Sequence, residues 1–67
     1  MGVLIVREMV GTSPNGWSDA ARQAVALASK TVRNIREVEV VQSTARVEGG
    51  VIVEYRVQMK LSFEYEA

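Results

Sequence analysis

The side chains of this 67-residue sequence that could do chemistry are chiefly carboxylates in segments of alternating polarity. The candidates in its second half are Glu39, Glu48, Glu54, Glu64 and Glu66. Carboxylate oxygens bind hard cations such as Ca²⁺ and Mg²⁺, above all where symmetry repeats one carboxylate around an axis. Because no DxDxDG-like loop is present, any such site must be assembled in space. We therefore take Glu39, Glu54 and Glu64 as candidate metal ligands, with solvated strand-face acids as the alternative interpretation.

Missing residue types narrow the chemistry further. The chain has no Cys and no His, which excludes disulfides, thiolate sites and the commonest zinc ligand. Any bound metal is therefore expected to be a hard one, calcium or magnesium. Ser13 and Ser18 have no His to activate them, and local spacing fixes no pair of carboxylates. We expect a protein that is not an enzyme.

Charge and hydropathy predict the cellular location and the classes of partner. Eight basic residues balance eight acidic ones, so no overall field attracts nucleic acid or a membrane surface. No apolar run approaches the ~18 residues of a membrane span. The N-terminus leads directly into a strand pattern, without a charged leader segment. The expected location is the cytoplasm.

The element that must position these carboxylates is a long strand, Val51 to Tyr65. Its alternate residues are apolar or aromatic: Val51, Val53, Tyr55, Val57, Met59, Leu61, Phe63 and Tyr65. The residues between them are polar except Ile52, so the strand has a dry face and a wet face. At ~3.3 Å per residue it reaches roughly 50 Å. A chain this small cannot cover that length alone, which predicts an oligomer.

Three elements are expected before this strand. Val3 to Val10 is rich in β-branched residues, has apolar residues on both faces and is predicted to end at Gly11. A helix is predicted to start between Pro14 and Trp17 and to end near Asn34, with Thr12 or Ser13 accepting from its free amides. Its dry stripe is rich in alanine: Trp17, Ala20, Ala21, Ala24, Val25, Ala28, Val32 and Ile35.

Glu37 to Val47 is the predicted second strand. Its apolar phase slips between Val40 and Val41, which predicts a bulge there. The sequence Glu48-Gly49-Gly50 predicts a tight hairpin into the long strand. The chain is therefore expected to form a single α+β domain over residues 1–67. Its order is β-α-β-β, with an antiparallel sheet of strand order first-third-second and the helix on the dry face.

These segments, in this order and at this length, resemble the dodecin family over nearly the whole chain. The features that carry the resemblance are Val10-Gly11-Thr12-Ser13-Pro14, Thr31-Val32-Arg33-Asn34, Val38-Glu39-Val40 and the strand from Tyr55 to Phe63. The resemblance implies a hollow dodecamer with helices outside and sheets inside. It also implies non-enzymatic binding, since many dodecins hold flavins in pairs and are thought to store or sequester them.

Two positions depart from the pattern of flavin-binding dodecins. Where these carry a Trp that stacks on the flavin, this sequence has Glu37, and where they carry a Gln that bonds the ring, it has Arg56. We group Gln58 with them as a ligand-binding position. Glu37 and Arg56 are expected on one face of paired strands, either as an ion pair filling the vacated pocket or as a polar site for an ion. Trp17 lies on the helix and is predicted to be a core or interface anchor.

Three functional hypotheses follow. The first is a dodecin-like binding or storage protein, a homododecamer that binds flavin weakly and binds calcium or another hard cation. Dodecin-like proteins without the stacking Trp resemble a separate branch for which calcium binding has been proposed. The alternatives are flavin (riboflavin or FMN) sequestration and a purely structural oligomer. The expected partners are other copies of the chain and a small ligand or ion.

Overall fold

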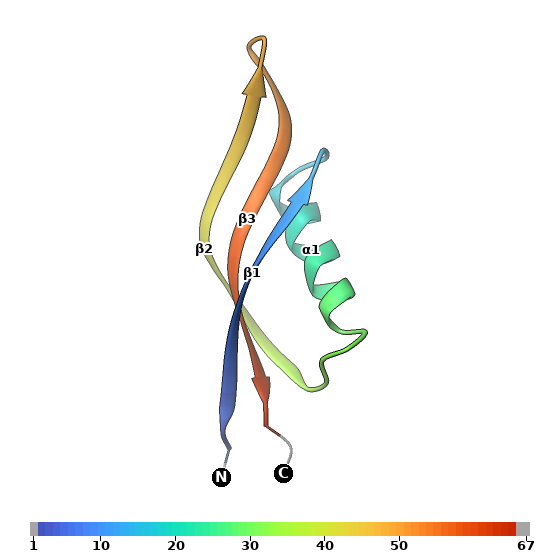
Figure 1. Cartoon of the computed structure of the whole chain (residues 1–67), viewed down its shortest axis with the longest axis vertical. Helices are drawn as coiled ribbons and strands as arrows, with labels where there is room; N and C mark the ends of the chain where they lie inside the picture. Colours follow the sequence, from blue (N-terminus) through green and yellow to red (C-terminus); the bar gives the residue numbers. More distant parts are fainter. Residues whose placement is uncertain (1, 66–67) are drawn as a thin grey trace.

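The computed structural model describes residues 2–65 and contains four elements. In chain order they are β1 (Leu4–Ser13), α1 (Trp17–Ala28), β2 (Ile35–Glu48) and β3 (Val51–Glu64). The three strands form one sheet in the order β1-β3-β2, and both pairings are antiparallel. The helix lies on one side of this twisted sheet (Figure 1). The predicted α+β fold, strand order and helix placement are confirmed.

The core lies where α1 crosses the sheet. Ala20, Val57 and Met59 are buried there, with Met9 and Ala24 packed against them. The alternate residues of β3 face the helix as predicted, because the dry positions in the middle of the strand are the buried ones. The opposite face of the sheet therefore carries the polar residues of β3.

Gly11 does not end β1, which is a correction to the sequence-based boundary. The strand runs on to Ser13, and Gly11 pairs with Val57. A Cβ atom at Gly11 would lie 2.6 Å from the carbonyl oxygen of Ala20 and 2.9 Å from the Cβ of Ala24. The missing side chain thus lets the helix backbone approach β1 closely, and the glycine is a packing residue rather than a strand terminator.

The connection into α1 is held by a buried hydroxyl. Ser13 Oγ accepts a hydrogen bond from the Asn15 amide at 3.0 Å and donates to Asp19 Oδ2 at 2.5 Å. Gln23 Nε2 donates to the same carboxylate oxygen at 2.7 Å. The helix starts at Trp17, inside the predicted range, but its N-cap is Gly16 and no side chain caps it. Ser13 therefore organises the loop and the first turn rather than accepting from a helix amide.

The helix ends at Ala28, earlier than the predicted end near Asn34. One more turn follows, in which the Val32 amide donates to the Ala28 carbonyl at 2.9 Å. Asn34 then adopts a positive φ of 62°, which reverses the chain. Ile35, predicted on the dry stripe of the helix, instead opens β2. Strand pairing with β3 outweighs helical periodicity here, since Ile35 lies opposite Phe63.

The bulge predicted between Val40 and Val41 is confirmed. The β2–β3 register shifts between Val40 and Gln42, and further shifts occur at residues 35–37 and 46–47. The extra residue turns the side chains that follow it to the opposite face of the sheet. Gln42 and Thr44 therefore lie on the polar side.

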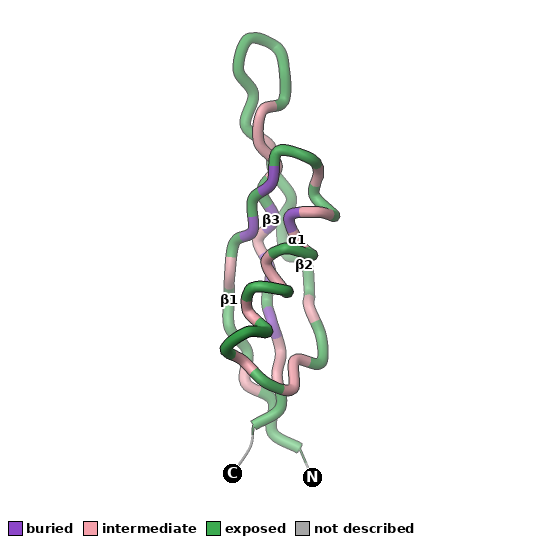
Figure 2. The backbone as a smooth tube through the Cα atoms, turned by 90° about the vertical axis from the view of Figure 1, so that its right-hand side faces the viewer, coloured by how far each residue is buried: buried purple, intermediate pink, exposed green. Residues whose placement is uncertain are grey.

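The molecule is long and thin for its mass. Its extents are 51 × 20 × 12 Å and its radius of gyration is 13.7 Å, against about 11 Å for a compact chain of this length. Its accessible area is 4995 Å², against about 4,200 Å² for a monomer of this mass. The β2–β3 hairpin projects beyond β1 and α1, and buried residues are confined to the middle of the molecule (Figures 1 and 2). No helix among residues 2–65 combines the length and hydrophobicity of a membrane span.

Candidate functional site on the sheet face opposite the helix

The polar face of the sheet is organised in cross-strand rows. Residues paired in an antiparallel sheet share a face and lie close, with Cβ atoms about 4.5–5.5 Å apart. Arg56 on β3 lies between Thr12 on β1 and Thr44 on β2. In the next row, Gln58 lies between Val10 and Gln42.

These two rows form a shallow polar cavity of about 280 Å³. It is lined by Val10, Gln42, Thr44, Arg56 and Gln58. Every polar side chain in this lining can donate hydrogen bonds, and no carboxylate is among them. Two of the three predicted ligand-binding residues, Arg56 and Gln58, therefore lie together. Gln42 and Thr44 were not predicted, because their facing depends on the bulge.

Glu37 lies far from this cavity. It faces Ser62, whereas Arg56 is six positions earlier on β3, a separation of roughly 20 Å along the strand. Both residues are on the polar face, as expected. The ion pair expected between them is wrong for a single chain, because the register separates them by more than two side-chain lengths.

The candidate metal ligands are also spread along this face. Glu39 lies opposite Lys60, Glu54 Oε1 is 3.8 Å from Arg46 Nε, and Glu64 Oε2 is 3.5 Å from Arg36 Nε. Together they extend over ten positions of β3, roughly 33 Å. No three His, Cys, Asp or Glu side chains converge on a metal-sized site within residues 2–65. The candidate Glu66 lies outside the described residues.

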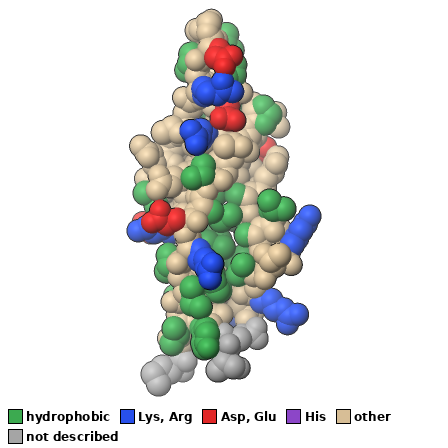
Figure 3. Space-filling model, in the orientation of Figure 1, with side chains coloured by type: hydrophobic (Ala, Val, Ile, Leu, Met, Phe, Trp, Pro, Cys, Tyr) green, Lys and Arg blue, Asp and Glu red, His purple; other side chains and the backbone are tan. Residues whose placement is uncertain are grey.

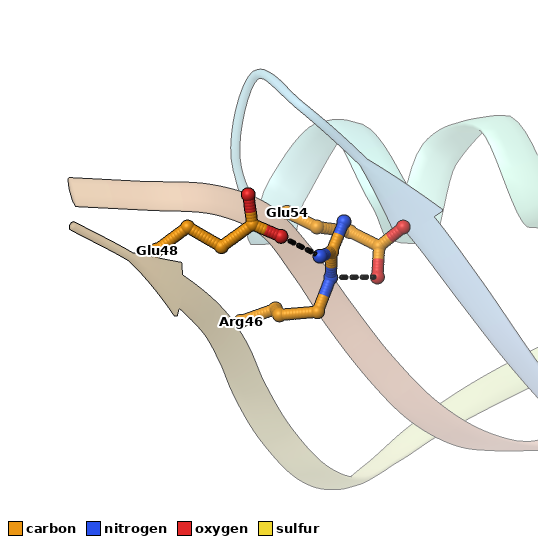
Figure 4. A network of polar contacts seen from close by, with 3 residues as sticks. All are labelled: Arg46, Glu48 and Glu54. Carbon is orange, nitrogen blue, oxygen red and sulfur yellow. Dashed lines mark hydrogen bonds and ion pairs between the residues drawn. The ribbon is translucent and has the colours of Figure 1, made fainter.

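Arg46 joins two carboxylates on the projecting hairpin. It pairs with Glu48 on its own strand and with Glu54 across on β3 (Figure 4). These side chains are roughly half exposed, so each pair contributes no more than about 1 kcal/mol. Within one chain, Glu48 and Glu54 thus have Arg46 as their ion-pair partner. Charged side chains gather at this end of the molecular surface (Figure 3).

Trp17 anchors the helix to the other side of the same strands. Its Nε1 donates to the Thr44 carbonyl oxygen at 2.8 Å. Its ring meets Tyr55 edge to face, with centroids 4.9 Å apart and planes at 80°. Trp17 is 42% exposed, so it is not a core residue, and its role as an interface anchor stays a prediction. Trp17 cannot reach the polar cavity, although it holds the backbone of Thr44, whose side chain lines that cavity.

The chain thus has a β-α-β-β order, one helix on the dry side of a three-stranded antiparallel sheet and a polar cavity on the other side, which defines a small α+β fold. The sequence model of the Dodecin family matches residues 3–66. The chain belongs to this family. It is 34% identical to the calcium dodecin of Mycobacterium tuberculosis over 64 residues, which is 96% of this chain and 90% of that protein.

Solved dodecin structures superpose closely on the chain. The dodecin of Streptomyces coelicolor gives a TM-score of 0.94 at 39% identity, covering 98% of this chain and 94% of that one. A single-residue variant of the Thermus thermophilus dodecin gives 0.95 at 31% identity, with full coverage of both chains. The calcium dodecin of M. tuberculosis, described as calcium chelating with a novel calcium-binding site, gives 0.83 at 33% identity, covering 96% and 91%.

Proposed function

We propose that this dodecin works as a hollow homododecamer that binds a small ion, calcium, without catalysing a reaction. The observation that carries the proposal is the amount of apolar surface that one protomer leaves uncovered on both sides of its sheet. A folded monomer with this much exposed apolar surface is expected to associate. A shell with helices outside would enclose the polar faces of the sheets.

Apolar residues are exposed on both sides of the sheet. On the side of β1 away from the helix they include Leu4, Val6 and Val10, each more than half exposed. On the other side Leu27 is 66% exposed and Val40 is 52% exposed. Figure 3 shows hydrophobic side chains at the surface along the lower part of the molecule. Burying such groups stabilises an assembly by about 25 cal/mol per Å².

Calcium is supported by the ligand chemistry and by the relative. Without His or Cys the chain offers oxygen ligands, which suit calcium. Among the described residues of a protomer, Glu54 and Glu64 each contact an arginine and Glu39 faces Lys60, so these three carboxylates do not converge. We propose that copies of one of these glutamates meet around a symmetry axis of the shell. The 34% identity to a protein named calcium dodecin supports calcium as the ion of this proposal.

Flavin fits the polar face less well. A carboxylate at Glu37 and a guanidinium at Arg56 occupy the positions that match the stacking and ring-bonding residues of flavin-binding dodecins. Covering either charge with a flat apolar ring incurs a desolvation cost. We propose that the protein has no nucleic-acid partner, because its net charge is zero.

Two measurements on the purified protein test this function. Light scattering is expected to give about twelve times 7.4 kDa, and a folded monomer of 7.4 kDa would contradict the assembly. Calcium is expected to raise the melting temperature and a chelator to lower it, because a ligand of the folded state adds RT ln(1 + [L]/Kd) to stability. Magnesium at the same concentration and ionic strength is the control ion.

Single variants then locate the cation site. Glu39→Gln, Glu54→Gln and Glu64→Gln are compared, with Glu8→Gln as the control, because Glu8 lies on the same face of the sheet and is not a candidate ligand. One of the three is expected to abolish the calcium-dependent shift while the control keeps it. Identical melting curves with calcium and with chelator would leave the purely structural oligomer, and tight quenching of riboflavin fluorescence would restore flavin storage.

A further inference from the structure

Arg56 differs from the other cations on its face of the sheet. Lys60 lies between two carboxylates in its row, Glu8 and Glu39. Arg46 contacts Glu48 and Glu54. Arg56 instead lies between Thr12 and Thr44, so both of its cross-strand neighbours are uncharged. Among the described residues it is also absent from the ion pairs of this face, which use Arg36 and Arg46.

The carboxylates in the rows nearest to Arg56 contact other side chains. Glu54, two positions before Arg56 on the same face, is 3.8 Å from Arg46. Glu8, one row beyond Gln58, accepts a hydrogen bond from Gln58 Nε2 at 3.5 Å. Within residues 2–65 the guanidinium therefore has donors without a protein anion, in a cavity whose other polar side chains are Gln42, Thr44 and Gln58.

We propose that this cavity is an oxyanion site, and that its ligand is a phosphate group, either free or on a small organic molecule. A guanidinium presents a planar fork of N–H donors that matches phosphate oxygens. The Thr44 hydroxyl and the Gln42 amide add donors from the neighbouring strand, and Gln58 adds the second N–H of the amide group whose first donates to Glu8. Such a set exceeds what the two oxygens of a carboxylate accept in one plane, and it suits the three or four oxygens of phosphate.

The volume supports a small ligand. About 280 Å³ equals the space of about nine water molecules at ≈30 Å³ each. This accommodates a phosphate with a short organic group. The inference goes beyond the proposed function, because the lining comes from one protomer and uses none of the candidate calcium ligands. Assembly with helices outside would place these phosphate sites on the inner surface of the shell.

The test is calorimetric titration of inorganic phosphate into the assembled protein, with chloride keeping the ionic strength constant. Saturable binding is expected. Arg56→Gln is expected to weaken it by about tenfold or more, about 1.4 kcal/mol, because it removes charge-assisted hydrogen bonds to the anion. Thr44→Val removes only a hydroxyl and is expected to weaken binding about threefold or more. The matched control is Arg46→Gln, which removes the same charge from an ion-paired position on the same face and is expected to change binding less than about twofold.

Three comparisons make the result decisive. Glycerol phosphate binding more tightly than phosphate would identify an organic phosphate as the ligand, and equal affinity would identify the free ion. Light scattering and melting without phosphate check that each variant remains assembled. No saturable phosphate binding, or equal losses in Arg56→Gln and Arg46→Gln, would overturn the site. A calcium-dependent melting shift that is retained in Arg56→Gln would show that calcium binding does not depend on the phosphate site.

Discussion

The close contact between β1 and α1 leaves no room for a side chain at Gly11. A Cβ atom placed there meets the Ala20 carbonyl oxygen at 2.6 Å, the Ala24 Cβ at 2.9 Å and the Ala20 carbonyl carbon at 3.3 Å. Two of these three atoms belong to the helix backbone, so no change of side-chain rotamer relieves the contact. Gly11→Ala is therefore expected to push the helix away from the sheet beside the buried Ala20 and Met59.

Two opposing terms set the magnitude. Overpacking a well-packed core costs about 1–3 kcal/mol, and the contact with backbone places Gly11→Ala in the upper half of this range. Replacing glycine lowers the entropy of the unfolded chain, which returns about 0.4–1 kcal/mol. The net expectation is a destabilisation of about 1–2.6 kcal/mol per protomer. For a domain of this size 1 kcal/mol shifts Tm by roughly 4–8 °C.

The assay is thermal and urea unfolding followed by circular dichroism. Wild type and variant are compared at one protomer concentration, because the stability of an oligomer depends on concentration. Gly2→Ala is the matched control, since a Cβ at that exposed position meets no atom within 4 Å. A Gly11→Ala protein that melts with the Gly2→Ala control would show that β1 and α1 are not in close contact, and would refute the packing described for this core.

Three further predictions concern the helix, its anchor and the ligand. Ala24→Leu is expected to overpack the helix–sheet contact and cost about 1–3 kcal/mol in urea unfolding, and an unchanged midpoint would mean that another helix face packs on the sheet. Trp17→Phe keeps an aromatic ring but loses the bond to the Thr44 carbonyl, so a loss of about 0.5–1.5 kcal/mol is expected in the same assay. Riboflavin, followed by its fluorescence, is expected to bind at least ~100-fold more weakly than to a Trp-bearing dodecin, about 2.7 kcal/mol. Glu37→Trp combined with Arg56→Gln is expected to recover binding better than either single change, and tight quenching by the unmodified protein would contradict the reasoning.

Local periodicity made much of the fold predictable. The alternation from Val51 to Tyr65 identifies a strand with one dry face whatever its neighbours are, because successive side chains of a strand point to opposite sides. The phase slip at Val40 and Val41 marks a bulge for the same reason, and the register shift confirms it. The hairpin at Gly49 and Gly50 follows from glycine, whose positive φ values of 58° and 77° carry no steric cost.

The ends of the helix and of β1 were harder to predict, because partners distant in sequence decide them. Val32 and Ile35 continue the helical spacing of apolar residues, yet Ile35 pairs with Phe63 in the sheet. Glycine often ends a strand, yet Gly11 pairs with Val57 and lies close to Ala20, so it is part of β1. Periodicity reports which side of an element is dry, and it does not report which neighbour covers that side.

For the candidate site, the residue types determined the range of possible ligands, and the tertiary structure decided which of these residues lie next to one another. Because His and Cys are absent, oxygen atoms are the expected metal ligands, and the glutamates, Arg56 and Gln58 could be named as candidates from the sequence. Only the register separates Glu37 from Arg56 by six positions of β3 and brings Gln42 and Thr44 to the cavity instead. The physical reason is that each bulge in β2 shifts the pairing of all later β2 residues with β3. The residues beside Arg56 therefore depend on the register of the whole strand pair, and no short motif reveals them.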